Sequence, residues 1–392
     1  MQSIFDEKIE RRNTGSMKWD VADGELPMWV ADMDFKTAPE VTDAILKRAR
    51  QGVFGYTLIT DEWYQAYINW WKHRHDFRIE KEWLIFCTGV VPAISSIVRK
   101  MTTVGENVVV MTPAYNIFFN SILNNGRNVL ESRLRYKEGV YQIDFEDLEE
   151  KLAEPQTSML ILCNPHNPIG KIWNRETLER IGMLCKKYHV LVLSDEIHCD
   201  ITKPGSGYIP FASVSEECRE NSITCIAPTK AFNLAGIQTA AVVIPDKTLR
   251  HKVNRGLNTD EVAEPNVFAA IAPAAAFGYG SKWLDELREY LWENRRFAER
   301  FITENIPEVS AVKGEATYLL WLDCRKVIGD STELCRFIRK DSGLYLSDGR
   351  EYRNGDGFLR MNLACPKERV QDGLERLKKS ISAYEEWVCR QC

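Results

Sequence analysis

The sequence lacks the features that mark nucleic-acid-binding, membrane and secreted proteins. It has no basic tract, and its 51 Lys and Arg residues are outnumbered by 56 Asp and Glu residues, which gives a formal charge of −5. No stretch reaches the roughly 18 apolar residues of a membrane span, and residues 1–20 contain no apolar core of the kind that a signal peptide needs. We therefore expect no nucleic-acid partner, no membrane partner and a cytoplasmic location.

Disulfide, metal and nucleotide motifs are also missing. The 392 residues include 11 cysteines, but their spacings form no disulfide framework in a chain of this length. Cys389 and Cys392 form a lone C-x-x-C, whereas a zinc site needs a second pair of ligands. We therefore expect reduced cysteines and no metal. The absence of G-x-G-x-x-G and G-x-x-x-x-G-K-[ST] disfavours an enzyme that uses a nicotinamide cofactor or ATP.

Short apolar runs in the middle of the chain predict strands that are buried on both faces. The runs are rich in Val, Ile and Leu and show no alternation with polar residues. Helical patterns lie between several of them, such as 175–188 with apolar Leu178, Ile181 and Cys185. This order predicts an α/β fold with a mostly parallel sheet flanked by helices. The predicted strands are 83–87, 107–111, 159–163, 190–193, 223–227 and 240–244.

The two ends of the chain differ from the middle. The apolar stretch 267–280 predicts a buried helix, and a long helical stretch follows at 281–303. Shorter segments come next, so we expect a smaller α+β domain that the N-terminal residues join. The predicted large domain covers residues 45–280, and the small domain covers 1–44 with 281–392. The shorter segments are 317–322, a helix at 331–340, 357–363 and a helix at 368–386.

Four polar segments directly follow predicted strands. In an open α/β sheet, ligands bind outside the carboxyl ends of the strands, so these segments are candidate binding loops. Segment 88–92 opens a helix, and the backbone N–H groups of Val90 and Val91 there would form an anion site. The other three segments are 164–170, 194–198 and 228–233.

Together the segments supply what one cofactor requires. The helix start at Val90 and Val91 suits a phosphate, and Tyr115 could stack on an aromatic ring. Asp195 could keep a pyridinium nitrogen protonated, and Lys230 could form a Schiff base with an aldehyde. These are the protein groups that a pyridoxal 5′-phosphate (PLP) enzyme needs, so the sequence predicts this cofactor.

Several longer motifs lead to a resemblance. Trp29–Phe35 reads Trp-Val-Ala-Asp-Met-Asp-Phe, and Asn167, Asp195 and Lys230 follow in order along the chain. The sequence resembles fold-type I PLP enzymes of the aminotransferase class I/II superfamily, and more narrowly the cystathionine β-lyase/C–S lyase branch of PatB type. The Trp29–Phe35 string is specific to the branch, and the other three residues are specific to the superfamily. Further matching motifs lie at 11–14, 18–20, 26–28, 53–57, 89–92 and 231–236, so the resemblance covers nearly the whole chain.

The resemblance implies how the cofactor would be held. Lys230 would be the Schiff-base lysine and the proton shuttle, and Asp195 would pair with the pyridine nitrogen. Asn167 and His198 would lie near the ring hydroxyl, while Tyr115 would stack on the ring.

Other residues would complete the site. Tyr56 would reach the phosphate of the other subunit, which implies a homodimer with shared active sites. Arg360 would bind the substrate α-carboxylate, a planar bidentate task that suits a guanidinium group, with support from Asn167 and from the backbone at Ala31.

Two positions depart from the aminotransferase pattern. Gln238 stands where many superfamily members carry an arginine that helps to hold the phosphate, and Ala227 stands where many carry a serine. Thr229 could supply the missing hydroxyl. These departures suit the lyase branch better than a general aminotransferase.

The resemblance implies a PLP-dependent C–S β-lyase. Such an enzyme cleaves L-cystathionine or related cysteine S-conjugates to pyruvate, ammonia and a thiol, which is homocysteine when cystathionine is the substrate. A class I/II aminotransferase is the first alternative, and the residues named above do not separate the two. Because some proteins of this branch also bind and restrain a transcription activator, a regulatory role is the second alternative.

Overall fold

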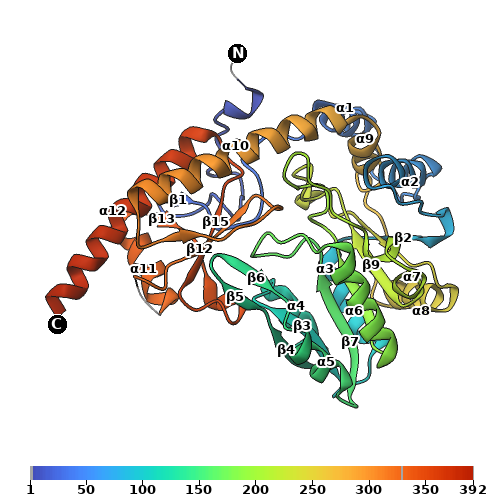
Figure 1. Ribbon diagram of the computed structural model, residues 1–392. Helices are drawn as coiled ribbons and strands as arrows, with labels where there is room; N and C mark the ends of the chain where they lie inside the picture. The colour runs from blue at the N-terminus through green and yellow to red at the C-terminus, as the bar shows by residue number, and fades with distance from the viewer. Residues whose placement is uncertain (1–2, 328–329, 392) are drawn as a thin grey trace.

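A seven-stranded sheet forms the centre of the larger part of the molecule. The computed structural model describes residues 3–327 and 330–391 (Figure 1). The strand order is β2-β10-β9-β8-β7-β3-β4; β10 is antiparallel to both neighbours, and the other pairs are parallel. The predicted mostly parallel sheet is thus confirmed. The strands are β2 (Leu84–Cys87), β3 (Asn107–Thr112), β4 (Asn128–Arg133), β7 (Thr157–Cys163), β8 (Leu191–Asp195), β9 (Ser222–Ile226) and β10 (Ala240–Val243).

The sheet is buried on both faces, as its apolar runs predict. In β3, Val108 and Val110 pack into one core, whereas Val109 and Met111 pack into another, because successive side chains of a strand point to opposite faces. Side chains of α3, α4 and α8 join the first core, and those of α5 and α6 join the second. The helices of this part are α1 (Pro39–Ala49), α2 (Asp61–His75), α3 (Val90–Met101), α4 (Asn116–Leu123), α5 (Phe145–Ala153), α6 (Arg175–Lys187), α7 (Glu216–Glu220), α8 (Lys247–Thr259) and α9 (Ile271–Tyr279).

Helix α6 shows how the local sequence places these helices. The side-chain oxygen of Asn174 accepts a hydrogen bond from the Thr177 N–H at 2.9 Å and so satisfies one of the free amides at the helix start. Leu178, Ile181 and Cys185 recur at helical spacing and are buried against the sheet. The helix covers the predicted segment to within one residue.

A four-stranded antiparallel sheet lies at the other end of the molecule, with the order β11-β12-β15-β14 (Figure 1). Helices α10, α11 and α12 share a core with it, and N-terminal residues 26–28 enter the same core. This is the predicted smaller α+β part; its boundaries near residues 45 and 280 stay a prediction. Its elements are β1 (Leu26–Pro27), α10 (Ser281–Asn305), β11 (Ser310–Ala311), β12 (Leu319–Asp323), α11 (Ser331–Ser342), β13 (Leu344–Tyr345), β14 (Ser347–Asp348), β15 (Phe358–Asn362) and α12 (Lys367–Gln391). A hairpin of β5 (Arg135–Lys137) and β6 (Val140–Gln142) forms a separate two-stranded sheet.

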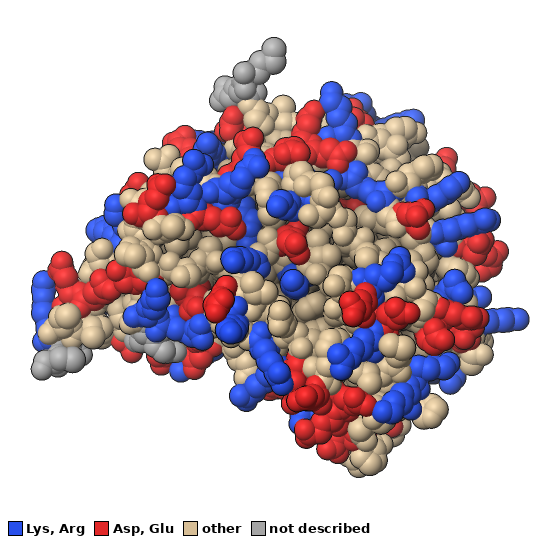
Figure 2. Space-filling model, in the orientation of Figure 1, with Lys and Arg blue, Asp and Glu red and all other residues tan. Residues whose placement is uncertain are grey.

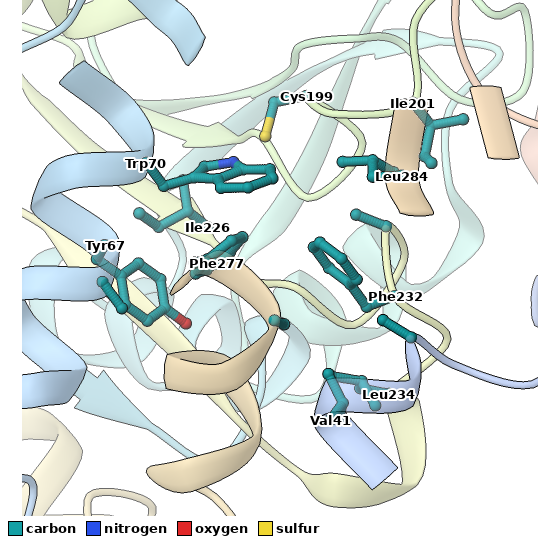
Figure 3. Packing of buried hydrophobic residues seen from close by; sticks show 14 of the residues in the cluster. Val41, Tyr67, Trp70, Cys199, Ile201, Ile226, Phe232, Leu234, Phe277 and Leu284 are labelled. Carbon is teal, nitrogen blue, oxygen red and sulfur yellow. The ribbon is translucent and has the colours of Figure 1, made fainter. Parts of the chain in front are cut away.

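An aromatic cluster supports the turn that follows β9. Phe232 is fully buried, and its ring lies 5.8 Å from Trp70 and 6.0 Å from Phe277, measured between ring centroids. Figure 3 shows these rings facing one another between α2, α9 and the turn. Because Phe232 comes two residues after Lys230, this packing fixes the backbone that carries the lysine.

The surface shown in Figure 2 carries charges of both signs, and the described cysteines form no disulfide. Figure 2 shows acidic and basic side chains interspersed over one face of the molecule. The ten cysteines within the described residues are free, and Cys392 of the terminal C-x-x-C lies outside those residues. In residues 3–327 and 330–391, no helix combines the length and the apolar character that crossing a membrane requires.

Candidate active site

A cavity of about 260 Å³ lies at the carboxyl ends of β7, β8 and β9. All four binding loops that follow the predicted strands contribute to its wall, and so does Tyr115. The topology therefore brings together segments that are far apart in the sequence. The lining residues are Ala31, Thr88, Gly89, Val90, Val91, Pro92, Tyr115, Cys163, Asn167, Asp195, Ile197, His198, Thr229, Lys230, Ala235, Gln238 and Thr239.

One end of the cavity is built to receive an anion. Helix α3 begins there, with Gly89 as its N-cap. The first amides of a helix have no partner within it, so the N–H groups of Val90 and Val91 are available, and the helix dipole adds partial positive charge. Thr229 and Gln238 bring a hydroxyl and an amide to the same cavity. These donors are electrically neutral, and they fit a phosphate group.

Asp195 ends strand β8 and lines the cavity. One of its carboxylate oxygens accepts a hydrogen bond from the Ile197 N–H at 3.1 Å. Burial raises the pKa of Asp195 to about 6, against the opposing effects of that N–H group and of the charge on Lys230. A buried carboxylate in this position is stabilised by a further positive charge, such as a protonated ring nitrogen.

Lys230 follows β9 and reaches the cavity from its other side. Its Nζ donates a hydrogen bond to the carbonyl oxygen of Ala31 at 2.7 Å. Burial, and after it the positive charge of Arg360, lowers the pKa of Lys230 to about 8, while Asp32 and Asp195 act in the opposite direction. A lysine with this pKa has a substantial neutral fraction near neutral pH, which both nucleophilic attack and proton removal require.

In the cofactor-free protein, we expect Lys230 to lose its proton near pH 8 rather than near the ordinary value of 10.5. The lowered pKa means that the folded protein holds the neutral amine between these two values, where an unfolded chain holds the charged one. The pH dependence of acetic anhydride labelling, read on the peptide that contains Lys230, measures this. The control is the same chain labelled in urea, and equal midpoints in the two conditions would contradict the expectation.

His198 borders the cavity as a neutral imidazole. Burial, and after it the charges of Lys230 and Arg360, lowers its pKa to about 3. Within the part of the chain that the structure describes, its buried Nδ1 atom has no hydrogen-bond partner. An unpaired buried polar atom is costly, so a polar group of a bound ligand would stabilise this atom.

Arg360 projects from β15 of the smaller sheet toward Asn167. Its Nη1 donates to the Asn167 side-chain oxygen at 3.3 Å, and its Nη2 donates to the Trp29 carbonyl oxygen at 2.8 Å. The guanidinium carbon lies 5.0 Å from the centre of the Tyr352 ring. These contacts hold the planar group beside the cavity, where it can bind a carboxylate in bidentate fashion.

Residues 29–33, which we call the crossing loop, pass between the two sheets at the cavity. Side chains from distant parts of the chain donate hydrogen bonds to every carbonyl oxygen of this loop, which fixes its backbone. The donors are Arg360 and Ser347 to Trp29, Asn362 to Val30, Lys230 and Tyr318 to Ala31, Asn362 and Lys18 to Asp32, and Arg11 and Asn233 to Met33. Most of these donors have residue types and positions that do not predict such a role. The one sequence signal is that Asn362 stands two residues after Arg360, on the same face of β15.

A buried charge cluster holds the residue that follows this loop. One oxygen of Asp34 accepts hydrogen bonds from Arg11 at 2.8 Å, from Lys18 at 3.1 Å and from the Trp19 indole at 2.8 Å. Burial acts to raise the pKa of Asp34, but the charge of Lys18, the Trp19 bond and the charge of Arg369 together hold it below the ordinary value. Asp34 is therefore an anion that ties the N-terminal segment to the smaller sheet's core.

Tyr56 is the one predicted site residue that lies away from the cavity of its own chain. Its side chain is fully exposed, and nearby Val53, Phe54 and Leu58 are exposed as well. The other predicted residues either line the cavity or, in the case of Arg360, contact Asn167, which lines it.

The residues that are present fit PLP. The cavity offers an anion site for the phosphate at α3, a carboxylate at Asp195, a reactive amine at Lys230 and an unpaired polar atom at His198. Fold and cavity together define the class of protein, which is that of the fold-type I PLP-dependent enzymes. The chain belongs to the aminotransferase class I and II family, whose model matches residues 26–377.

Individual relatives are similar over nearly the full length. The chain is 42% identical over 386 residues to cystathionine beta-lyase PatB of Bacillus subtilis, covering 96% of this chain and 100% of the relative. It is 32% identical to protein MalY of Escherichia coli, covering 97% of this chain and 99% of the relative. Among solved structures, cystalysin from Treponema denticola, which contains a PLP cofactor, matches with a TM-score of 0.94 and 34% identity, covering 98% of this chain and 100% of that one.

A second solved structure is the PLP-bound C–S lyase from Staphylococcus hominis. It matches with a TM-score of 0.91 and 32% identity, covering 97% of this chain and 98% of that one. These likenesses confirm the predicted fold type, the predicted cofactor and the predicted resemblance to the C–S lyase branch.

Proposed function

We propose that this chain is a PLP-dependent C–S β-lyase that cleaves L-cystathionine or related cysteine S-conjugates. The reaction consumes water and releases pyruvate, ammonia and a thiol, which is homocysteine when cystathionine is the substrate. The observation that carries the proposal is the cavity itself, which places the Lys230 amine, the Asp195 carboxylate and the phosphate-binding start of α3 around one space. Full-length relatives that are named cystathionine beta-lyases support the choice of reaction.

Different groups of the cavity wall would hold the phosphate, the ring and the ring nitrogen of the cofactor. The amides of Val90 and Val91 would bind the phosphate, Tyr115 would cover the ring, and Asp195 would hold the ring nitrogen in its protonated form. The chemistry that PLP supplies when bound is an electron sink for the electrons of the broken Cα–H bond.

The substrate would be held and deprotonated by side chains from both sheets. Arg360 would bind the α-carboxylate in bidentate fashion, with Asn167 beside it. Lys230 would take the α-proton on Nζ, because a pKa lowered to about 8 makes the neutral amine far more abundant near neutral pH than it is in an ordinary lysine. A dry cavity wall of Tyr115, Ile197 and Cys163 would limit competing reactions with water.

The test is product analysis with purified, PLP-saturated protein. Incubation with L-cystathionine should yield pyruvate, detected with lactate dehydrogenase, and an equal amount of free thiol. Amino-group transfer to a keto acid without thiol release would replace the proposal with an aminotransferase. If neither thiol release nor amino-group transfer occurs with cystathionine or with S-alkyl cysteines, the proposal is overturned.

The proposal includes a homodimer in which Tyr56 reaches the phosphate in the partner subunit. Exposed apolar residues around Tyr56 support this arrangement, because such a group is stabilised when a second copy covers it. The proposed large domain of residues 45–280 would carry this contact, and residues 1–44 with 281–392 would form the small domain. A reducing, cytoplasmic location suits the free thiols of the described cysteines.

We expect Tyr56→Ala to weaken PLP binding by about tenfold, since it removes one hydrogen bond to a charged group. Dialysis against decreasing PLP concentrations, followed by absorbance, measures the change.

Coexpression of two variant chains then tests whether the active sites are shared between subunits. At a PLP concentration too low to load the Tyr56→Ala chain, coexpressed Tyr56→Ala and Lys230→Ala chains should show more activity than either variant alone, because a mixed dimer keeps one site free of both changes. Activity no greater than that of the Tyr56→Ala chain would contradict shared sites.

A further inference from the structure

The carbonyl oxygen of Ala31 accepts two hydrogen bonds at the edge of the cavity. Lys230 Nζ donates at 2.7 Å, and the hydroxyl of Tyr318 donates at 2.9 Å. A carbonyl oxygen has two lone pairs, so both are used. The lysine and the tyrosine are therefore joined through one atom, although they are 88 positions apart in the chain.

Tyr318 itself is firmly held between the two sheets. Its side chain is 3% exposed, and its backbone carbonyl accepts a hydrogen bond from the Leu363 N–H at 2.8 Å. The preceding residue, Thr317, has a φ of 67° and donates its N–H to the Ile201 carbonyl at 2.8 Å. The hydroxyl therefore has a fixed position relative to both parts of the molecule.

The hydroxyl acts as a donor and keeps its proton. Burial, and after it the negative charge of Asp32, raises the pKa of Tyr318 far above the ordinary value. The phenol is thus neutral at any pH at which the protein would be assayed. This excludes Tyr318 as a base and leaves the hydrogen bond to Ala31 as the role of its hydroxyl.

We propose that Tyr318 is a positioning residue for Lys230, which it holds in place by fixing the Ala31 carbonyl oxygen. This rests on the proposed function only for the role of Lys230 in proton removal. Whenever the Lys230 amine is not bound to the cofactor, it donates a hydrogen bond to the Ala31 carbonyl oxygen. The hydrogen bond from Tyr318 fixes the position of that oxygen. Arg360 donates to Asn167 and to the Trp29 carbonyl oxygen and not to Tyr318, so the direct hydrogen bonds of the carboxylate-binding side chain do not include the tyrosine hydroxyl.

The test replaces Tyr318 with phenylalanine, which removes one hydroxyl and leaves the ring. In the cofactor-free protein, the midpoint of Lys230 labelling by acetic anhydride should fall by about one pH unit, because the charged amine loses a fixed acceptor. In the holoenzyme, kcat should fall by about tenfold while KM stays unchanged, because misplacement of a catalytic group slows the reaction without weakening substrate binding.

The matched control is Tyr384→Phe. Tyr384 is 1% exposed and donates its hydroxyl to Glu333 at 2.8 Å, away from the cavity. The control should leave both the labelling midpoint and kcat unchanged, although it loses the same kind of hydrogen bond. The labelling experiment uses neither PLP nor substrate, so its result stands even if no pyruvate is formed from cystathionine.

Two results would overturn the proposal. One is a folded Tyr318→Phe protein with the labelling midpoint and kcat of the unchanged chain. The other is a crystal structure of the unchanged holoenzyme in which the Tyr318 hydroxyl is turned away from the Ala31 carbonyl oxygen. The second result applies even if the variant does not fold.

Discussion

Lys230→Ala is expected to abolish pyruvate formation, with a loss of about 10⁴-fold or more. The change removes the only amine among the residues that line the cavity, and with it both the covalent attachment of PLP and the proposed acceptor of the α-proton. The visible absorbance of the lysine-bound cofactor should disappear at the same time. Pyruvate assay and absorbance spectroscopy on the same preparation measure both effects.

The fold should survive this change, since the aromatic packing of Phe232 holds the turn without help from the lysine. Lys36→Ala is the control, because Lys36 is exposed and pairs with Glu7 at the surface. The control should keep full activity and full absorbance. A Lys230→Ala protein that retains activity close to that of the control would exclude Lys230 as the catalytic residue.

Arg360→Lys is expected to raise the KM for L-cystathionine by about 100-fold, which corresponds to about 2.7 kcal/mol. Lysine keeps the positive charge but cannot make the two parallel hydrogen bonds that a guanidinium group makes to a carboxylate. It also has one nitrogen in place of the two that bond separately to Asn167 and to the Trp29 carbonyl oxygen. Initial rates over a range of substrate concentrations separate KM from kcat.

Arg325→Lys provides the matched control for that experiment. Arg325 also binds a carboxylate in bidentate fashion, at 2.9 and 2.8 Å from the oxygens of Asp323, but on the surface and away from the cavity. Its replacement should leave KM unchanged. If Arg360→Lys also leaves KM unchanged, the α-carboxylate is bound by another group.

The central sheet was predictable because strands that are buried on both faces consist of continuous apolar runs without polar alternation. Strands β7 and β8 are continuous apolar runs, so both were located to within two residues. Strand β4 was missed, because it lies at the edge of the sheet and reads Asn-Val-Leu-Glu-Ser-Arg, with several of its side chains exposed to water. The other edge strand, β2, is apolar and was predicted, so the polar composition of β4, and not its edge position alone, explains why it was missed.

The site was predictable only where chemistry follows directly from residue type and position. Asp195 is the last residue of β8 and Lys230 follows the end of β9 by four positions, and a carboxylate and an amine at that edge of the sheet indicate a cofactor. Tyr318, Asn233 and Asn362 were not predictable, because they act by donating hydrogen bonds to backbone carbonyls far away in the chain. A backbone carbonyl is the same in every residue, so the sequence carries no trace of such a pairing.

The crossing loop has a consequence for the order in which this protein matures. Val30 and Asn362 are bonded to each other across 332 positions of the chain, so the loop cannot be fixed until β15 has been synthesised. A nascent chain that ends before Asn362 contains all seven strands of the central sheet, yet it lacks the side chain that donates to the Val30 and Asp32 carbonyl oxygens on either side of Ala31. Such long-range contacts form slowly, because their loop closure is entropically costly. Competence to hold the cofactor should therefore appear at the end of folding, after most of the hydrophobic core is in place.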